Sequence, residues 1–334
     1  MTAARRTADD AAQRTSTDDR GMPPELDAAI VIVNYRTSEL VERCVASVRA
    51  DAGELRMETV IVDNDSGDGS VERLRSALPS ATVIAMPENG GFAAGVNVGF
   101  ANSRADTVVV LNPDTELAPN ALSLLLARLR EHQGTGVVAP LLEDAEGHLT
   151  ANGYRRFPNL LTLAVDLCLP VGYALVHAPA LHPYVLAPNA LCAGSVTAHV
   201  CGAVMAIRRQ AYEQAGSFDE GFFLYLEETE WQQRVAARGW AIEVVPAARA
   251  LHLVRGGGDE SLVPSPHFVT SALRYLRLQG VPPTLSRAVL SAALALSWVL
   301  LLAIAWLPAK RERARLQARG YRALLRRTWA AVPE

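Results

Sequence analysis

Short apolar runs alternate with amphipathic segments from residue 28 onward. The first run, Ala28 to Val33, is continuously apolar, which is typical of a strand buried on both faces of a parallel sheet. The next segment has apolar residues at helical spacing: Leu40, Val41, Cys44, Val45 and Val48. Further apolar runs at 59–62, 82–85 and 107–111 are separated by two more predicted helices, one from about residue 71 and one over 89–102. This alternation predicts a Rossmann-like α/β domain with a mostly parallel sheet.

Polar residues and glycines follow each predicted strand. In sheets of this kind, ligands bind beyond the carboxyl ends of the strands, so these residues are candidates for a binding site. Polar residues are also ordinary turn formers, but four such loops meeting at one edge favour a site. The strand-end candidates are Asn34, Tyr35, Asp63, Asp65, Gly91, Asn112 and Asp114.

Two phosphate-binding motifs are absent from the sequence. No GxGxxG follows the first strand, which disfavours a nicotinamide-dependent dehydrogenase, and no Gly-Lys-Ser or Gly-Lys-Thr marks a P-loop. A divalent cation is another way to meet phosphate charge, and Asp114 could ligate Mg²⁺ or Mn²⁺ against a diphosphate. The alternative for Asn112-Pro113-Asp114 is a simple turn.

Small residues mark the start of the predicted helix after the third strand. Around Gly91 the backbone N–H groups could face an anion or a nucleotide, and Asn97 could point into the same crevice. A tight turn with close helix packing is the alternative.

Three carboxylates, Glu227, Glu228 and Glu230, follow an aromatic run and precede Trp231. They could simply favour the dipole of a helix N-terminus. A carboxylate beside a hydrophobic wall could instead act as a general base, because such surroundings raise its pKa. His252, expected on a loop after a strand at 241–245, could be a neutral metal ligand, although a lone histidine is more often structural.

Composition narrows the function classes. Half of the residues are hydrophobic and a fifth are charged, so the chain can build a large core. The net charge of -3 argues against a nucleic-acid partner, and the four cysteines show no metal-ligand spacing. A reducing cytoplasm fits this cysteine usage best. We expect residues 1–24 to be a disordered, mobile tail rather than a targeting segment.

Five ordered motifs over about 28–258 resemble family 2 glycosyltransferases, and among them the bacterial rhamnosyltransferase-like branch. They are IVIVNYR at 30–36, VIVDNDS at 60–66, NGGFAAGVN at 89–97, LNPD at 111–114 and FDEGFFLYLEE at 218–228. The resemblance implies a GT-A fold in a catalytic domain at 25–260. Within this domain, 25–125 would bind the nucleotide sugar and 126–260 the acceptor.

The resemblance also implies site roles. Asp63 and the Asn34 loop would hold the base and ribose, Asn112-Pro113-Asp114 would replace the metal-binding DxD motif, and Glu228 would be the catalytic base. Gly202 and Ala203 belong to a segment that returns to the sheet beside the acceptor, where we also place Glu230 and Trp231. The implied reaction is an inverting transfer of a sugar, such as L-rhamnose from dTDP-L-rhamnose, to a hydroxyl of a cell-envelope glycan or a lipid-linked acceptor.

Two departures from the family pattern leave alternatives open. Glu228 stands where the family usually has Asp, so Glu227 or Glu230 could be the base instead, and Asn112 replaces the first acid of DxD. With both motifs altered, the chain could also be a catalytically inactive GT-A-like scaffold in a membrane polysaccharide assembly.

The C-terminal part, 261–334, is expected to be a helical membrane-associating extension. Residues 288–307 carry no charge over a length that could span a bilayer, and a basic tail follows. The basic tail and the catalytic domain both belong in the cytoplasm, which one straight crossing cannot satisfy. We therefore favour a helix lying in the inner leaflet at the cytoplasmic face of the membrane over a true span, with a soluble helix packed in a homodimer as a third option. The irregular, proline-interrupted stretch over about 150–195 is expected to be an acceptor-side insertion.

Overall fold

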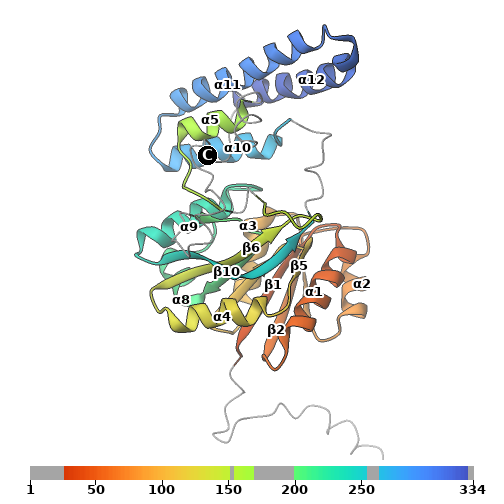
Figure 1. Ribbon diagram of the computed structural model, residues 1–334, viewed down its shortest axis with the longest axis vertical. Helices are drawn as coiled ribbons and strands as arrows, with labels where there is room; N and C mark the ends of the chain where they lie inside the picture. Colours follow the sequence, from red (N-terminus) through yellow and green to blue (C-terminus); the bar gives the residue numbers. More distant parts are fainter. Residues whose placement is uncertain (1–25, 151–153, 169–198, 254–262, 330–334) are drawn as a thin grey trace, which may run out of the picture.

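The computed structural model describes residues 26–150, 154–168, 199–253 and 263–329 (Figure 1). The expected N-terminal tail and most of the expected acceptor-side insertion lie outside these residues. The elements at the N-terminal side are β1 (Ala28–Asn34), α1 (Ser38–Ala52), β2 (Met57–Asp63), α2 (Ser70–Ala77), β3 (Thr82–Ala85), α3 (Gly91–Ala101), β4 (Thr107–Leu111), β5 (Thr115–Leu117), α4 (Ala121–Glu131) and β6 (Thr135–Glu143).

The later elements include two further strands of the main sheet. They are β7 (Tyr154–Arg155), α5 (Leu160–Leu167), β8 (His199–Val200), β9 (Val204–Arg208), α8 (Arg209–Ala215), α9 (Glu227–Ala237), β10 (Ala241–His252), α10 (Pro266–Leu278), α11 (Pro283–Ile304) and α12 (Arg311–Thr328). The predicted alternation of strands and helices in the first half is confirmed.

Eight strands form the main sheet in the order β3-β2-β1-β4-β9-β6-β10-β5. The first four are parallel, as the apolar runs predict, so their carboxyl ends lie at one edge. β9 runs antiparallel to β4 and β6, and β5 runs antiparallel to β10. The sheet is therefore mixed but mostly parallel.

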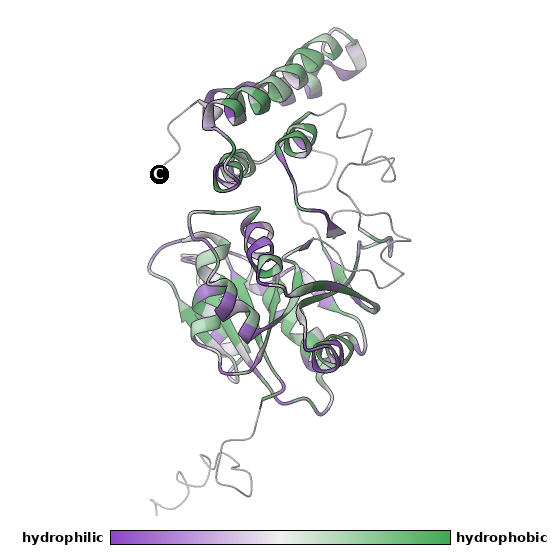
Figure 2. Ribbon diagram, turned by 90° about the vertical axis from the view of Figure 1, so that its left-hand side faces the viewer, coloured by the Kyte–Doolittle hydropathy of each residue, from purple (hydrophilic) through white to green (hydrophobic). Residues whose placement is uncertain are grey.

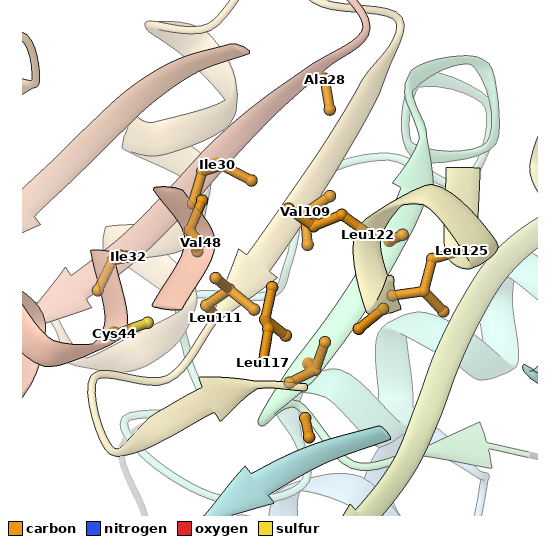
Figure 3. Close-up of a cluster of buried hydrophobic side chains, with 14 of the residues drawn as sticks. Ala28, Ile30, Ile32, Cys44, Val48, Val109, Leu111, Leu117, Leu122 and Leu125 are labelled. Atoms are coloured by element: carbon orange, nitrogen blue, oxygen red, sulfur yellow. The ribbon is translucent and has the colours of Figure 1, made fainter. Parts of the chain in front are cut away.

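Both faces of the sheet are covered by hydrophobic cores. One core joins Ile30, Ile32 and Leu111 of the strands to Cys44 and Val48 of α1 and to Leu122 and Leu125 of α4, as Figure 3 shows. The other face packs on α3, α8 and α9 through residues such as Phe100, Phe218 and Trp231. Burial on both faces explains why the strands are continuously apolar instead of alternating.

A third core lies in a separate helical layer beside the sheet (Figures 1 and 2). It joins α5, α10, α11 and α12 to Phe222 and Leu226, two residues of the segment that precedes α9. α11 is the one helix in the described chain that is long and apolar enough to cross a membrane by length and composition, with a mean hydropathy of 2.1. The C-terminal helices thus share a core with the segment that precedes α9.

Candidate active site

A pocket of about 650 Å³ lies at the carboxyl ends of β1, β2 and β4. Four of the predicted nucleotide-binding residues line it: Tyr35, Gly91, Asn112 and Asp114. Thr37, Asn64 and Phe223 also line it, together with His267 from α10. We call this cavity the donor pocket, because the resemblance to glycosyltransferases predicts a nucleotide sugar at this edge of the sheet, where parallel sheets bind their ligands.

Asn34 and Asp63 lie beneath this pocket and do not line it. Both side chains are buried, and Asn34 Nδ2 donates to Asp63 Oδ2 at 2.6 Å. The backbone N–H of Ser66 donates to the other carboxylate oxygen, Asp63 Oδ1, at 3.0 Å. These hydrogen bonds hold the β1 and β2 loops together, and the contact of Asn34 and Asp63 with a nucleotide stays a prediction. Asp65 is an exposed turn residue with a φ of 59°, outside the pocket lining.

Gly91 allows an unusually close contact between α3 and the segment before α9. Its φ is +84°, and a Cβ added to it would lie 2.2 Å from the carbonyl oxygen of Phe223. That same oxygen accepts a hydrogen bond from the N–H of Phe92 at 3.1 Å. Asn64 fixes the turn from the other side, because its side chain bonds Gly90 N at 3.1 Å and Gly91 O at 2.9 Å. Only glycine combines this backbone conformation with this space.

Asp114 and His252 lie together at the rim of the donor pocket. Asp114 Oδ1 is 3.4 Å from His252 Nε2, and both side chains are partly exposed. Strand pairing sets this contact, since His252 pairs with Thr115 of β5. The expectation that His252 lies on a loop is wrong: β10 continues past an irregularity between Val245 and Arg249 and ends at His252.

This pair fits a divalent cation. A carboxylate oxygen and an imidazole nitrogen can supply two ligands, and Mg²⁺ or Mn²⁺ in such sites takes its remaining ligands from substrate phosphates and water. Over the described ranges, no third His, Cys, Asp or Glu completes a three-residue metal cluster. The cation would therefore bind strongly only with a diphosphate in the pocket.

Glu228 lines a second cavity of about 500 Å³, which we call the second pocket. Burial raises the pKa of Glu228 above the usual glutamate range, and the nearby positive charge of Arg155 opposes this shift. Leu226, the residue just before α9, has a φ of 67°, and Tyr225 before it has a φ of 71°. Left-handed backbone at two consecutive non-glycine residues is strained and must be held by surrounding contacts.

The other members of the acidic cluster face elsewhere. Glu227 is buried, with one carboxylate oxygen lacking a hydrogen-bond partner among the described residues, and burial followed by the charge of Glu228 raises its pKa well above normal. Glu230 forms two hydrogen bonds with Arg234, at 2.8 and 2.9 Å. Trp231 is fully buried, stacks on Phe218 at 4.6 Å and donates to Gly216 O. Neither Glu230 nor Trp231 lines a pocket, and their acceptor contacts stay a prediction.

The two pockets are neighbours. Gly202 lies between them, because a Cβ there would be 3.6 Å from both Glu228 Cγ and Phe92 Cε1. Ala203 is buried next to it and accepts a hydrogen bond from Asn112 N at 2.9 Å, so it supports the Asn112 loop instead of facing an acceptor. Burial and then the charge of Glu228 raise the pKa of the Cys201 thiol to about 11, and Asp114 adds to the same shift.

Helix α10 holds residues 219–225, the segment that precedes α9, in place. Arg274 makes two hydrogen bonds to Asp219, at 2.9 and 2.7 Å, and Ser271 Oγ donates to Leu224 O at 2.8 Å. His267 stacks on Phe223 at 4.7 Å in the donor pocket. The next residue, Phe268, contacts Tyr225 edge-on in the second pocket. A helix expected only to contact the membrane therefore contributes to both cavities.

Asn97 is the remaining predicted nucleotide-binding residue that does not line the donor pocket. Asn97 Nδ2 donates to the carbonyl oxygen of Phe218 at 2.9 Å, and the backbone N–H of Phe218 donates to Asn97 Oδ1 at 2.9 Å. The Asn97 side chain also forms hydrogen bonds with Glu220 and Tyr212. The side chain supports residues 212–220 and does not line the donor pocket. Arg155, His199 and His267 also line the pockets. They lie in segments that carry no recognisable motif, so the sequence did not predict them.

The fold is that of the GT-A class. A mannosyltransferase from Pyrobaculum calidifontis, solved with GDP-Man and Mn²⁺, matches 91% of this chain and 86% of its own at a TM-score of 0.52 and 15% identity. GalNAc-T7, solved with UDP, GalNAc and Mn²⁺, matches 76% of this chain and 48% of its own at a TM-score of 0.56 and 17% identity.

The family follows from sequence. Residues 29–215, more than half of the chain, match the Glycosyl transferase family 2 model, and the chain belongs to this family. An N-acetylglucosaminyl-diphospho-decaprenol L-rhamnosyltransferase of Mycobacterium tuberculosis is 27% identical over 67% of this chain and 75% of its own length. A low-salt glycan biosynthesis hexosyltransferase of Haloferax volcanii is 27% identical over 68% of this chain and 67% of its own.

Proposed function

We propose that this glycosyltransferase is an inverting enzyme that depends on a divalent cation. It transfers a sugar, L-rhamnose from dTDP-L-rhamnose, to a hydroxyl of a lipid-linked acceptor in the synthesis of a cell-envelope glycan. The Mycobacterium relative, a rhamnosyltransferase named for a lipid-linked sugar, supports both substrates. Undecaprenyl-phosphate sugar transferases of Pseudomonas, 31% identical over 41% of the chain, also support a lipid-linked acceptor.

One observation carries the mechanism: Glu228 lines a pocket next to the one that holds Asp114. The raised pKa of Glu228 makes its carboxylate a stronger base than an exposed glutamate. Glu228 takes the proton of the acceptor hydroxyl as the oxygen attacks the anomeric carbon. The bond from that carbon to the diphosphate breaks, and its electron pair leaves with the nucleoside diphosphate. A β-linked donor would give an α-linked product.

Asp114 and His252 would hold the cation, and Tyr35, Asn64 and Gly91 would surround the nucleotide. A bound cation would neutralise charge on the departing diphosphate. The role of Glu227 would be indirect, because it lies behind Glu228 and faces neither pocket.

We further propose that α11 and α12 lie flat in the cytoplasmic leaflet of the membrane. The helices form an antiparallel hairpin, in which Ser291 of α11 bonds Thr328 at the end of α12 at 3.0 Å. If α11 crossed the bilayer, it would carry the arginines of α12 into the hydrocarbon, which is costly. Apolar side chains exposed at the end of α11 and in the following turn, such as Val299, Trp306 and Leu307, would insert into the lipid interface.

The test begins with nucleotide binding. Thermal unfolding with dTDP, UDP or GDP, each with Mn²⁺, should show strong stabilisation by one nucleotide, dTDP, and none without the cation. Asp114→Ala should abolish this stabilisation. Glu228→Gln should keep it and lose sugar transfer. A Glu228→Gln enzyme with full transfer activity would refute the assigned base. Nucleotide binding without any turnover in the wild type would identify an inactive scaffold.

A further inference from the structure

The second pocket is lined by both polar and apolar side chains. Arg155, Asp166, His199 and Glu228 supply the polar groups, whereas Leu163 of α5 and Phe268 of α10 are among the apolar residues that line it. A lining that combines polar groups with apolar side chains suits a sugar ring, which has hydroxyls around its edge and C–H groups on its faces.

His199 has an unused hydrogen-bonding atom in this pocket. The residue is buried, and its Nδ1 has no hydrogen-bond partner within the described part of the chain. Burial, and then the positive charge of Arg155, lower its pKa to about 3, so the imidazole is neutral at physiological pH. The ring is held in place by stacking on Phe157, with centroids 5.8 Å apart. Buried polar atoms without partners are rare in proteins and call for an explanation.

Carboxyl groups outnumber positively charged groups among the described residues that line the pocket. Arg155 is paired with Asp166 at 3.5 Å, so its positive charge is already balanced. Glu228 adds a second carboxyl group. Among the lining residues, one guanidinium thus stands against two carboxyl groups, and a phosphate or a carboxylate would be repelled at this short range.

We infer that the second pocket binds an uncharged sugar unit of the acceptor, that His199 Nδ1 hydrogen-bonds one of its hydroxyls, and that Asp166 selects against anionic units. The inference rests on the proposed function, in which Glu228 deprotonates an acceptor hydroxyl. His199 is a positioning residue in this scheme. The phosphate groups of a lipid-linked acceptor lie outside the pocket.

Binding of simple glycosides tests the inference without turnover. The probes are octyl glycosides of neutral hexoses and N-acetylhexosamines, compared with octyl glucuronide, titrated by calorimetry into the full chain with Mn²⁺ and dTDP. We expect saturable binding of at least one neutral glycoside and binding of the glucuronide at least ten-fold weaker. His199→Ala should weaken the neutral glycoside by about five- to ten-fold, the size of one lost hydrogen bond.

Three further variants keep the experiment decisive. His148→Gln changes an exposed histidine on a loop and should bind as the wild type does. His199→Phe keeps an aromatic ring without a hydrogen-bonding atom and should weaken binding of the neutral glycoside to a similar extent, which serves if His199→Ala does not fold. Asp166→Asn removes one negative charge, so it should narrow the preference for the neutral glycoside over the glucuronide by about five-fold or more.

Several results would overturn the inference: no saturable binding of any neutral glycoside, equal or tighter binding of the glucuronide by the wild type, or unchanged affinity in both His199 variants. Stabilisation by dTDP and Mn²⁺ reports on the donor pocket alone and should be the same in all these variants. If dTDP and Mn²⁺ do not stabilise the wild type, the proposed function is refuted. The glycoside titrations then still test the second pocket separately.

Discussion

Replacing Gly91 by alanine should damage the fold and the donor pocket together. An alanine at a φ of +84° adopts a left-handed conformation, which costs about 1–2 kcal/mol. Its Cβ would also meet Phe223 O at 2.2 Å, a contact that backbone atoms must move to relieve. Forced movement of this kind typically costs about 1–3 kcal/mol. We therefore expect Gly91→Ala to lower the free energy of unfolding by about 2–5 kcal/mol.

The chain offers a matched control at Gly67. Its φ is +63°, and an added Cβ would have no atom within 4 Å. Gly67→Ala should cost the conformational part alone, about 1–2 kcal/mol. The entropy that alanine removes from the unfolded chain is the same at both sites and cancels in the comparison.

Urea unfolding followed by tryptophan fluorescence measures both variants against the wild type. Because Phe223 lines the donor pocket, Gly91→Ala should also lose stabilisation by dTDP and Mn²⁺, while Gly67→Ala should keep it. Equal destabilisation of the two variants would refute the close contact between Gly91 and Phe223.

Three further predictions follow from the site and the helical layer. Glu227→Gln should stabilise the protein at neutral pH. The pKa of Glu227 is raised in the folded state, so the wild type loses stability as the pH rises above the ordinary glutamate pKa, by up to about 1.4 kcal/mol per pH unit. The variant should lack this contribution to the pH dependence of the free energy of unfolding, measured in urea at pH 5 to 8. Arg274→Met should reduce transfer at least ten-fold, because Asp219 loses two hydrogen bonds that hold the segment before α9. The control is Arg277→Met, at an exposed position of the same helix, and an unaffected Arg274→Met enzyme would contradict the role of α10. In vesicle flotation, the protein should bind phosphatidylglycerol vesicles and bind phosphatidylcholine vesicles weakly, and Trp306→Ser should reduce binding to phosphatidylglycerol. Protein that alkaline carbonate does not extract from membranes would favour a true span.

The sequence predicted the sheet and the donor side of the site because both depend on local patterns. Continuous apolar runs identified the strands, and parallel strands bring their ends to one edge. This reasoning places Asp114 correctly at the pocket rim. It could not distinguish Asn34 and Asp63, which bond to each other beneath the pocket, from Tyr35 and Asn64, which line it. Neighbouring residues at a strand end point in opposite directions, and their side-chain partners depend on loop geometry.

Helix direction explains the placement of the other candidates. Successive residues of a helix point about 100° apart, so the four candidates at the start of α9 cannot share one direction. Glu228 faces the second pocket, while Glu230 and Trp231 turn toward Arg234 and the core. Asn97 lies six residues beyond Gly91 on α3 and faces residues 212–220. His199 and His267 come from segments far along the chain, and only tertiary packing brings them to the pockets.

The core shared by α5, the C-terminal helices, Phe222 and Leu226 means that the enzyme cannot be divided into a soluble half and an anchor. A truncation before α10 would expose Phe222 and Leu226 and release the strained backbone at Tyr225 that precedes Glu228. A version of this protein that ends before α10 would for that reason be a poor substitute for the whole chain.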